Sequence, residues 1–133
     1  MSFKKVRNAH KTENTEDYLE LIEGLIELRG EARIVDIAQK LDIAQATANK
    51  TIIRLHKQGY IEKEPYRSIF LTQTGKIIAD NSKNRHVIVF NFLKKLGLDN
   101  KTASADSEGI EHHVSNKTLL VMEKFNKLKK INF

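Results

Sequence analysis

The chain has 133 residues, is 40% hydrophobic and contains no cysteine, so disulfides and thiolate metal sites are excluded. Lys and Arg number 23 against 17 Asp and Glu, and the resulting net charge of +6 suits a nucleic-acid partner. No run of about 18 apolar residues occurs, and the N-terminus lacks the apolar segment of a secretory signal. We therefore expect a cytoplasmic protein with no membrane association.

The N-terminal residues 1–14 are basic and polar without a periodic pattern, which predicts a flexible arm. From Thr15, which can act as a helix cap, apolar residues recur at helical spacing. The pattern predicts a helix from about Glu16 to Arg29, with Gly30 as its stop signal.

A helix-turn-helix followed by a hairpin is predicted next. Short helices are expected over residues 32–41 and 45–57, and strands over 60–64 and 68–72, joined by a turn at 65–67. The apolar positions expected where the two helices meet are Val35, Ile37, Ala38, Leu41, Ile43, Ala48, Ile52 and Leu55. Residues 15–74 are thus expected to form a winged helix-turn-helix DNA-binding domain.

The second of these helices carries polar side chains of the types that bind DNA. They are Gln45, Thr47, Asn49, Lys50 and Arg54. We expect base contacts from Gln45 and Asn49, and phosphate contacts from Thr47, Lys50, Arg33 and Arg67, the last near the tip of the hairpin. The partner would be double-stranded DNA.

Residues 75–133 are predicted to be helical, so the fold class is mainly α with one β-hairpin wing. Helices are expected from about Lys76 to Leu96, briefly near 99–101, over 105–113, and over 117–130 with Ser115 as cap. The apolar side chains exceed what so small a half needs for its own core; they include Ile88, Phe90, Phe92, Leu93, Leu96, Leu119, Leu120 and Met122. They indicate a homodimer, whose twofold symmetry implies a pseudo-palindromic operator.

Carboxylates and histidines form three groups that could hold a metal. Asp17 and Glu20 are three residues apart on one helix, and His86 lies on the long helix after the hairpin. The third group is Glu108, Glu111 and His112, whose spacing places them on one side of a helix. Mixed oxygen and imidazole donors suit manganese(II) or iron(II) better than structural zinc, calcium or magnesium. Each residue alone also fits an ordinary charged surface.

Five motifs together resemble the DtxR family of metalloregulators, and most closely its manganese-responsive MntR branch. They are Glu16-Asp17-Tyr18-x-Glu20, the helix-turn-helix of residues 34–61, the wing ending Phe70-Leu71-Thr72, Arg85-His86, and Glu108-Gly109-Ile110-Glu111-His112-His113. The resemblance implies that Asp17, Glu20, His86, Glu108, Glu111 and His112 bind one or two manganese(II) ions per subunit. Asp17 stands where iron-responsive relatives carry methionine, which favours manganese. Ala44 and Ala46 depart from the serine-type cap and proline that usually open the recognition helix.

The resemblance further implies a repressor of metal-ion transport genes, with the metal as corepressor. Since the implied ligands come from both halves of the chain, a bound ion would fix the angle between the halves and so the spacing of two recognition helices. An iron-responsive or small-ligand-responsive winged-helix repressor is the closest alternative. A di-metal carboxylate enzyme would need Glu-x-x-His pairs, which the implied ligands lack. We expect neither an enzyme nor a small organic substrate; a structural chromatin protein would bind DNA without metal.

Overall fold

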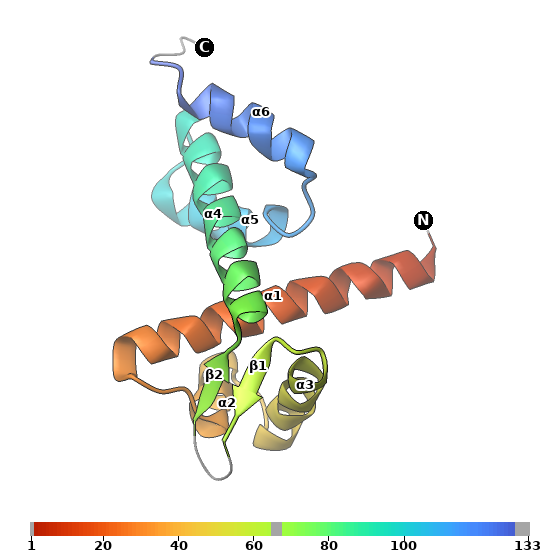
Figure 1. The fold of residues 1–133 in the computed structure, drawn as a ribbon. Helices are drawn as coiled ribbons and strands as arrows, with labels where there is room; N and C mark the ends of the chain where they lie inside the picture. The colour runs from red at the N-terminus through yellow and green to blue at the C-terminus, as the bar shows by residue number, and fades with distance from the viewer. Residues whose placement is uncertain (1, 65–67, 130–133) are drawn as a thin grey trace. The chain divides into compact units, whose positions relative to one another are not determined.

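The computed structural model describes residues 2–64 and 68–129. Within these ranges the elements are α1 (Phe3–Arg29), α2 (Ile34–Leu41), α3 (Gln45–Lys57), β1 (Ile61–Lys63), β2 (Ile69–Leu71), α4 (Gln73–Lys95), α5 (Asn100–Ile110) and α6 (Asn116–Asn126) (Figure 1). The chain divides into unit 1, Met1–Asp80, and unit 2, Asn81–Phe133, so the division falls within α4. The predicted turn at 65–67, including Arg67, lies outside the described residues.

Helix α1 begins at Phe3, so the prediction that it begins near Glu16 is wrong. Ser2 acts as the cap, because its backbone is extended and its hydroxyl accepts a hydrogen bond from the Lys5 amide at 3.2 Å. Thr15, expected to be the cap, lies inside the helix, where its hydroxyl donates to the Lys11 carbonyl at 3.0 Å. The first glycine or proline of the chain is Gly24, so no helix breaker lies between Phe3 and the predicted start.

The predicted helix-turn-helix is present. Helix α3 has the predicted bounds, and α2 begins two residues later than expected. Five of the expected contact positions are buried, namely Ile37, Ala38, Ala48, Ile52 and Leu55, and two more, Leu41 and Ile43, pack against them. Val35 is 48% exposed, so its expected place in the core is wrong. It lies about 100° around α2 from Ile34, outside the stripe that Ile34, Ile37 and Leu41 form.

The two predicted strands form an antiparallel hairpin, each shorter than expected. Ile61 pairs with Leu71 and Lys63 with Ile69. The hairpin is attached to the rest of unit 1 by a bridge in which the Ile69 amide donates to the Ala32 carbonyl at 2.8 Å. Ile61 and Ile69 are buried in the core that α1, α2 and α3 share, so the hairpin is packed against the helix-turn-helix as a wing.

Two helices were predicted near 99–101 and over 105–113, but unit 2 of the structure has a single helix, α5, in their place. The intervening Thr102, Ala103 and Ser104 include no helix breaker, and Ala103 packs into the core of the unit. That core combines Ile88, Val89 and Leu93 of α4 with Ala103 of α5 and Leu119 of α6. Ser115 caps α6 as predicted, accepting from the Thr118 amide at 3.1 Å. Helix α6 ends at Asn126, earlier than the predicted Lys130, which is outside the described residues.

None of the described helices combines the length and the apolar character needed to cross a bilayer.

The junction between β2 and α4 requires a glycine at position 75. Thr72 donates through its hydroxyl to the Gly59 carbonyl at 2.7 Å, and its backbone amide donates to the Tyr60 carbonyl at 3.1 Å. The same hydroxyl accepts from the Gly75 amide at 3.1 Å, which brings the first turn of α4 against Tyr60. A Cβ atom at position 75 would overlap the Tyr60 carbonyl oxygen and lie 3.0 Å from its carbon.

We therefore expect Gly75→Ala to lower the free energy of unfolding by about 1–3 kcal/mol, because backbone would have to move. Gly24→Ala is the matched control, since no atom lies within 4 Å of the added carbon and alanine favours the middle of a helix. It should raise the free energy of unfolding by about 0.5–1 kcal/mol. Urea unfolding of both variants tests this, and equal stabilities would contradict the close approach at Tyr60.

Candidate metal centre and nucleic-acid interface

Three of the expected ligands lie together in unit 2. His86 comes from α4, Glu108 from the last turns of α5, and Glu111 from the turn directly after it. The His86 Nδ1 atom lies 2.6 Å from Glu111 Oε2 and 3.7 Å from Glu108 Oε1. One donor atom from each of the three side chains lies within 4.8 Å of the others, a spacing that a single metal ion can span.

Glu111 is the most buried member of this group, with a side chain that is 2% exposed. Burial is the main cause that raises its pKa to about 7, and repulsion from Glu108 acts in the same direction. His86 and His112 act in the opposite direction; His112 Nε2 lies 3.5 Å from Glu111 Oε1. A buried carboxylate beside a second acid is costly when both are charged, and a cation would remove that cost.

The His86 ring is held by neighbours from its own unit. The Ser107 hydroxyl lies 3.4 Å from Nδ1, and the Phe90 ring stacks on the imidazole with centroids 6.1 Å apart. Ser107 is itself fixed, because its hydroxyl also donates to the Ser104 carbonyl at 3.0 Å. Such supporting contacts orient an imidazole toward the position where a ligand atom is needed.

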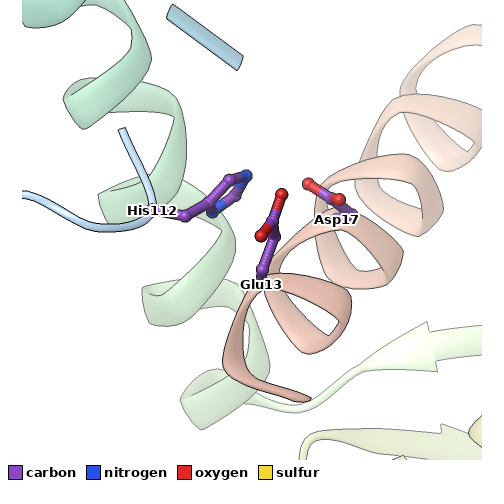
Figure 2. A group of neighbouring side chains, drawn as sticks. All are labelled: Glu13, Asp17 and His112. Carbon is purple, nitrogen blue, oxygen red and sulfur yellow. The ribbon is translucent and has the colours of Figure 1, made fainter. Parts of the chain in front are cut away.

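In unit 1 the structure pairs Asp17 with Glu13. The two side chains project from the same face of α1, one turn apart, with donor atoms within 4.8 Å of each other (Figure 2). Glu20, the expected neighbour of Asp17, is half-buried and is not in this group. His112, also labelled in Figure 2, belongs to unit 2, where it is buried and its ring meets that of His113 edge to face. Glu13 was missed because residues 1–14 were expected to lack a helix; the i, i+4 spacing identifies it once α1 extends to Phe3.

The expected DNA-binding side chains of α3 are largely accessible. Gln45, Thr47 and Lys50 are exposed, and Asn49 is half-buried. Asn49 Oδ1 is buried and accepts no hydrogen bond from the described residues. Arg33 is exposed and pairs with Glu31 at 3.1 Å.

Two further features of α3 bear on DNA binding. Arg54, one of the polar positions noted on this helix, donates from Nη1 to the Thr15 hydroxyl at 2.9 Å and to Gln58 Oε1 at 3.0 Å. It thus connects the recognition helix to α1. Ala44 occupies the N-cap position and makes no side-chain cap hydrogen bond, which agrees with the departure seen in the sequence.

The raised pKa of Glu111 predicts how the stability of the metal-free protein changes with pH. The folded state holds this proton more tightly than the unfolded chain, so the contribution to stability is present below about pH 4.5 and is lost as the pH rises through about 7. Glu111→Gln removes this loss of stability at high pH, because the amide side chain does not ionise. In thermal unfolding with EDTA, the melting temperature of Glu111→Gln relative to the wild type should be higher at about pH 8 than at about pH 5.

The control for that measurement is Glu62→Gln, which alters an exposed side chain on β1. Its melting temperature relative to the wild type should be the same at both pH values. A difference between Glu111→Gln and the wild type that does not change with pH would contradict the assignment to Glu111.

Family models match both parts of the chain. The model described as iron dependent repressor, N-terminal DNA binding domain, matches residues 10–69. The model described as iron dependent repressor, metal binding and dimerisation domain, matches residues 72–129. The first match contains the helix-turn-helix and β1 and ends at the first residue of β2, and the second contains His86, Glu108 and Glu111.

Characterised relatives match over most of the chain. The transcriptional regulator MntR of Escherichia coli O6:H1 is 49% identical over 117 residues, which are 88% of this chain and 76% of that protein. The HTH-type transcriptional regulator MntR of Bacillus subtilis (strain 168) is 40% identical over 104 residues, covering 78% of this chain and 73% of the relative.

Solved structures agree with these matches. The structure of the manganese regulator SloR has a TM-score of 0.73 at 25% identity and covers 84% of this chain. The structure of T. acidophilum IdeR has a TM-score of 0.75 at 22% identity, covers 86% of this chain and shows the shared fold. This chain spans 52% and 55% of those two chains, respectively. The chain therefore belongs to the DtxR family of metal-dependent, DNA-binding transcriptional repressors, in its MntR branch, and acts on DNA as a homodimer and not as an enzyme.

Proposed function

We propose that the protein is a manganese(II)-dependent repressor of metal-ion transport genes, with manganese as its corepressor. The observation that carries this is the group formed by His86, Glu108 and Glu111, in which one imidazole nitrogen lies near both a nearly fully buried carboxylate and a second acid. Oxygen-rich donors with imidazole suit manganese(II) and iron(II), whereas zinc favours a tetrahedral sulfur and nitrogen set. The similar solved structure of SloR is described as that of a manganese regulator, which supports the same metal.

The proposed ligand set is the one that the sequence resemblance implies: Asp17, Glu20, His86, Glu108, Glu111 and His112. Manganese(II) favours six donors in octahedral geometry, and the group in unit 2 supplies three within 4.8 Å. Donors from α1 would supply the remainder, and Glu13 offers one more carboxylate beside Asp17. With Glu108 as a bridge, the set accommodates one or two ions per subunit.

Metal-dependent DNA binding follows if donors from both units bind the same ion. Residues 15–74 would then form the DNA-binding domain, and residues 75–133 the metal-binding and dimerisation domain. Without metal, Glu108 and Glu111 repel each other and the burial of Glu111 opposes its charge. Manganese would favour the DNA-binding arrangement of the units by a population shift, with a coupling of about 1–3 kcal/mol. Since a transcriptional regulator must reach the chromosome, we place the protein in the cytoplasm.

The dimer would use apolar side chains that unit 2 does not bury itself. Of the residues expected at the interface, Ile88, Leu93 and Leu119 belong to the core of the unit. Leu96 and Leu120 are exposed, as are Val87 and Val121 of α4 and α6. Twofold symmetry would set two recognition helices about 34–36 Å apart, matching a pseudo-palindromic operator. Gln45 and Asn49 would contact bases, and Arg33, Thr47, Lys50 and Arg67 would contact phosphates.

A DNA-binding titration against manganese(II), iron(II), cobalt(II) and zinc(II), with an EDTA control, tests the metal. We expect manganese to promote binding at the lowest free metal concentration and EDTA to abolish it. Glu108→Ala should abolish the metal response, and Asp17→Met should weaken the preference for manganese. Asp106→Ala, an exposed acid two residues before Glu108, is the matched control and should behave as the wild type. Stronger activation by iron(II) would favour the iron-responsive alternative, and binding in EDTA would contradict metal dependence.

The role of α3 is tested by Lys50→Ala. Removing one cation that neutralises a phosphate should weaken DNA binding and lower the slope of log affinity against log salt by about 0.9. Lys101→Ala removes an exposed lysine of α5 and is the charge-matched control. Fluorescence anisotropy with labelled duplex at several salt concentrations measures both variants. An unchanged affinity for Lys50→Ala at low salt would exclude the proposed contact.

A further inference from the structure

The N-terminal part of α1 presents a strongly basic surface that the proposed function does not use. The first twelve residues contain Lys4, Lys5, Arg7 and Lys11, and the first acidic residue of the chain is Glu13. All four cationic side chains are exposed. Lys4, Arg7 and Lys11 are spaced by three and four residues, so they share one face of the helix. We call these three side chains the basic stripe.

The basic stripe is held by a continuous helix. The Ser2 hydroxyl accepts from the Lys5 amide, and the Ser2 carbonyl accepts from the Val6 amide at 3.2 Å, so the first turn of α1 is capped. Lys4 to Lys11 span about 10 Å at 1.5 Å rise per residue, which equals the rise of about three phosphates of one strand measured along the axis of a duplex. Because the helix already fixes the three cations, their binding to a phosphate backbone does not include the entropy cost of ordering a flexible arm.

The face of α1 that carries the basic stripe borders a cavity within unit 1, and α3 lines the same cavity. The cavity has a volume of about 360 Å³, and its lining includes Asn8, Lys11 and Thr15 of α1 with Arg54 and Gln58 of α3. The hydrogen bond from Arg54 to Thr15 joins the two helices at this place. Arg54 follows Lys50 by four residues, so both lie on one face of α3. Cationic side chains therefore run from Lys50 and Arg54 on α3 to the stripe on α1.

A duplex suits this surface better than a small anion held in the cavity. Glu16 also lines the cavity and is 8% exposed, so its carboxylate disfavours an anion that enters. A phosphate backbone that passes over the rim would meet Lys11 and Arg54 without entering. The +6 net charge of the chain is consistent with a polyanion that contacts an extended surface.

We propose that the basic stripe of α1 contacts the phosphate backbone of DNA that flanks the segment read by α3. This inference rests on the proposed DNA binding by α3 and extends the DNA contact to the first turns of α1. The contact is independent of base sequence, because only backbone charges are recognised. It raises affinity for operator and non-operator DNA by the same factor.

The test compares Lys4→Gln/Arg7→Gln/Lys11→Gln with the wild type, using labelled mixed-sequence duplex and manganese between about 50 and 200 mM salt. The triple variant should bind more weakly. Its slope of log affinity against log salt should fall by about 0.9 for each phosphate that is no longer neutralised, or about 2.7 for three. A duplex shortened to the segment covered by α3 should show no difference between the two proteins. The melting temperature and manganese affinity should stay unchanged.

The charge-matched control is Lys101→Gln/Lys117→Gln/Lys124→Gln, which alters three lysines of unit 2. Lys4→Arg/Arg7→Lys/Lys11→Arg keeps the charges and should restore the wild-type slope. Equal slopes of log affinity against log salt for the two glutamine variants would overturn the proposed DNA contact by the basic stripe. The proposed DNA binding by α3 would be unaffected by that result. Failure of the wild type to bind DNA with manganese would overturn both proposals. Saturable binding of inorganic phosphate that requires Lys11 would replace the duplex with a small-anion site and overturn the inference.

Discussion

The candidate metal centre depends on the cost of burying the Glu111 carboxylate. In the folded chain this acid is almost completely buried, 2.6 Å from His86 and near a second carboxylate. Burial raises its pKa to about 7, so near neutral pH the group lies close to the boundary between its charged and neutral forms. A protein that served stability alone would not keep such a group, because an apolar side chain of similar volume would cost less. A divalent cation makes the same arrangement favourable, since it supplies the charge that the site lacks.

The part of the fold that was predicted well is the part governed by local signals. Helix α3 has the predicted bounds because its apolar residues, Ala48, Ile52 and Leu55, repeat at helical spacing and Gly59 follows its end. The two strands were found because apolar residues in the sequence flank a proline-containing segment, residues 65–67, that predicts a turn. The members of the metal centre were selected by resemblance to a family, because spacing alone can equally describe a charged surface. The structure brings His86 to Glu108 and Glu111 across more than twenty residues of sequence, and no local pattern reports that contact.

The errors have physical reasons of the same kind. Residues 3–14 lack an apolar stripe, yet they are helical because a serine caps them and no breaker interrupts them. That error also concealed Glu13 beside Asp17. Val35 is apolar but lies off the stripe of α2, and α5 is continuous because Ala103 packs into a core that only the tertiary structure defines. The need for glycine at position 75 comes from Tyr60, which is distant in sequence.

The cap of the recognition helix has a consequence for how the helix meets its target. Ala44 provides no side-chain oxygen, and the backbone amides of Gln45, Ala46 and Thr47 have no acceptor within the helix, because its first backbone bond runs from the Ala48 amide to the Ala44 carbonyl. These amides face outward with the positive end of the helix dipole, which attracts anions. A serine at position 44 would occupy one of them in the free protein and would have to be displaced by an incoming phosphate. With alanine at position 44, the first turn of the free helix is less stable than it would be with serine. Binding of the operator would then stabilise this turn more than it would with serine.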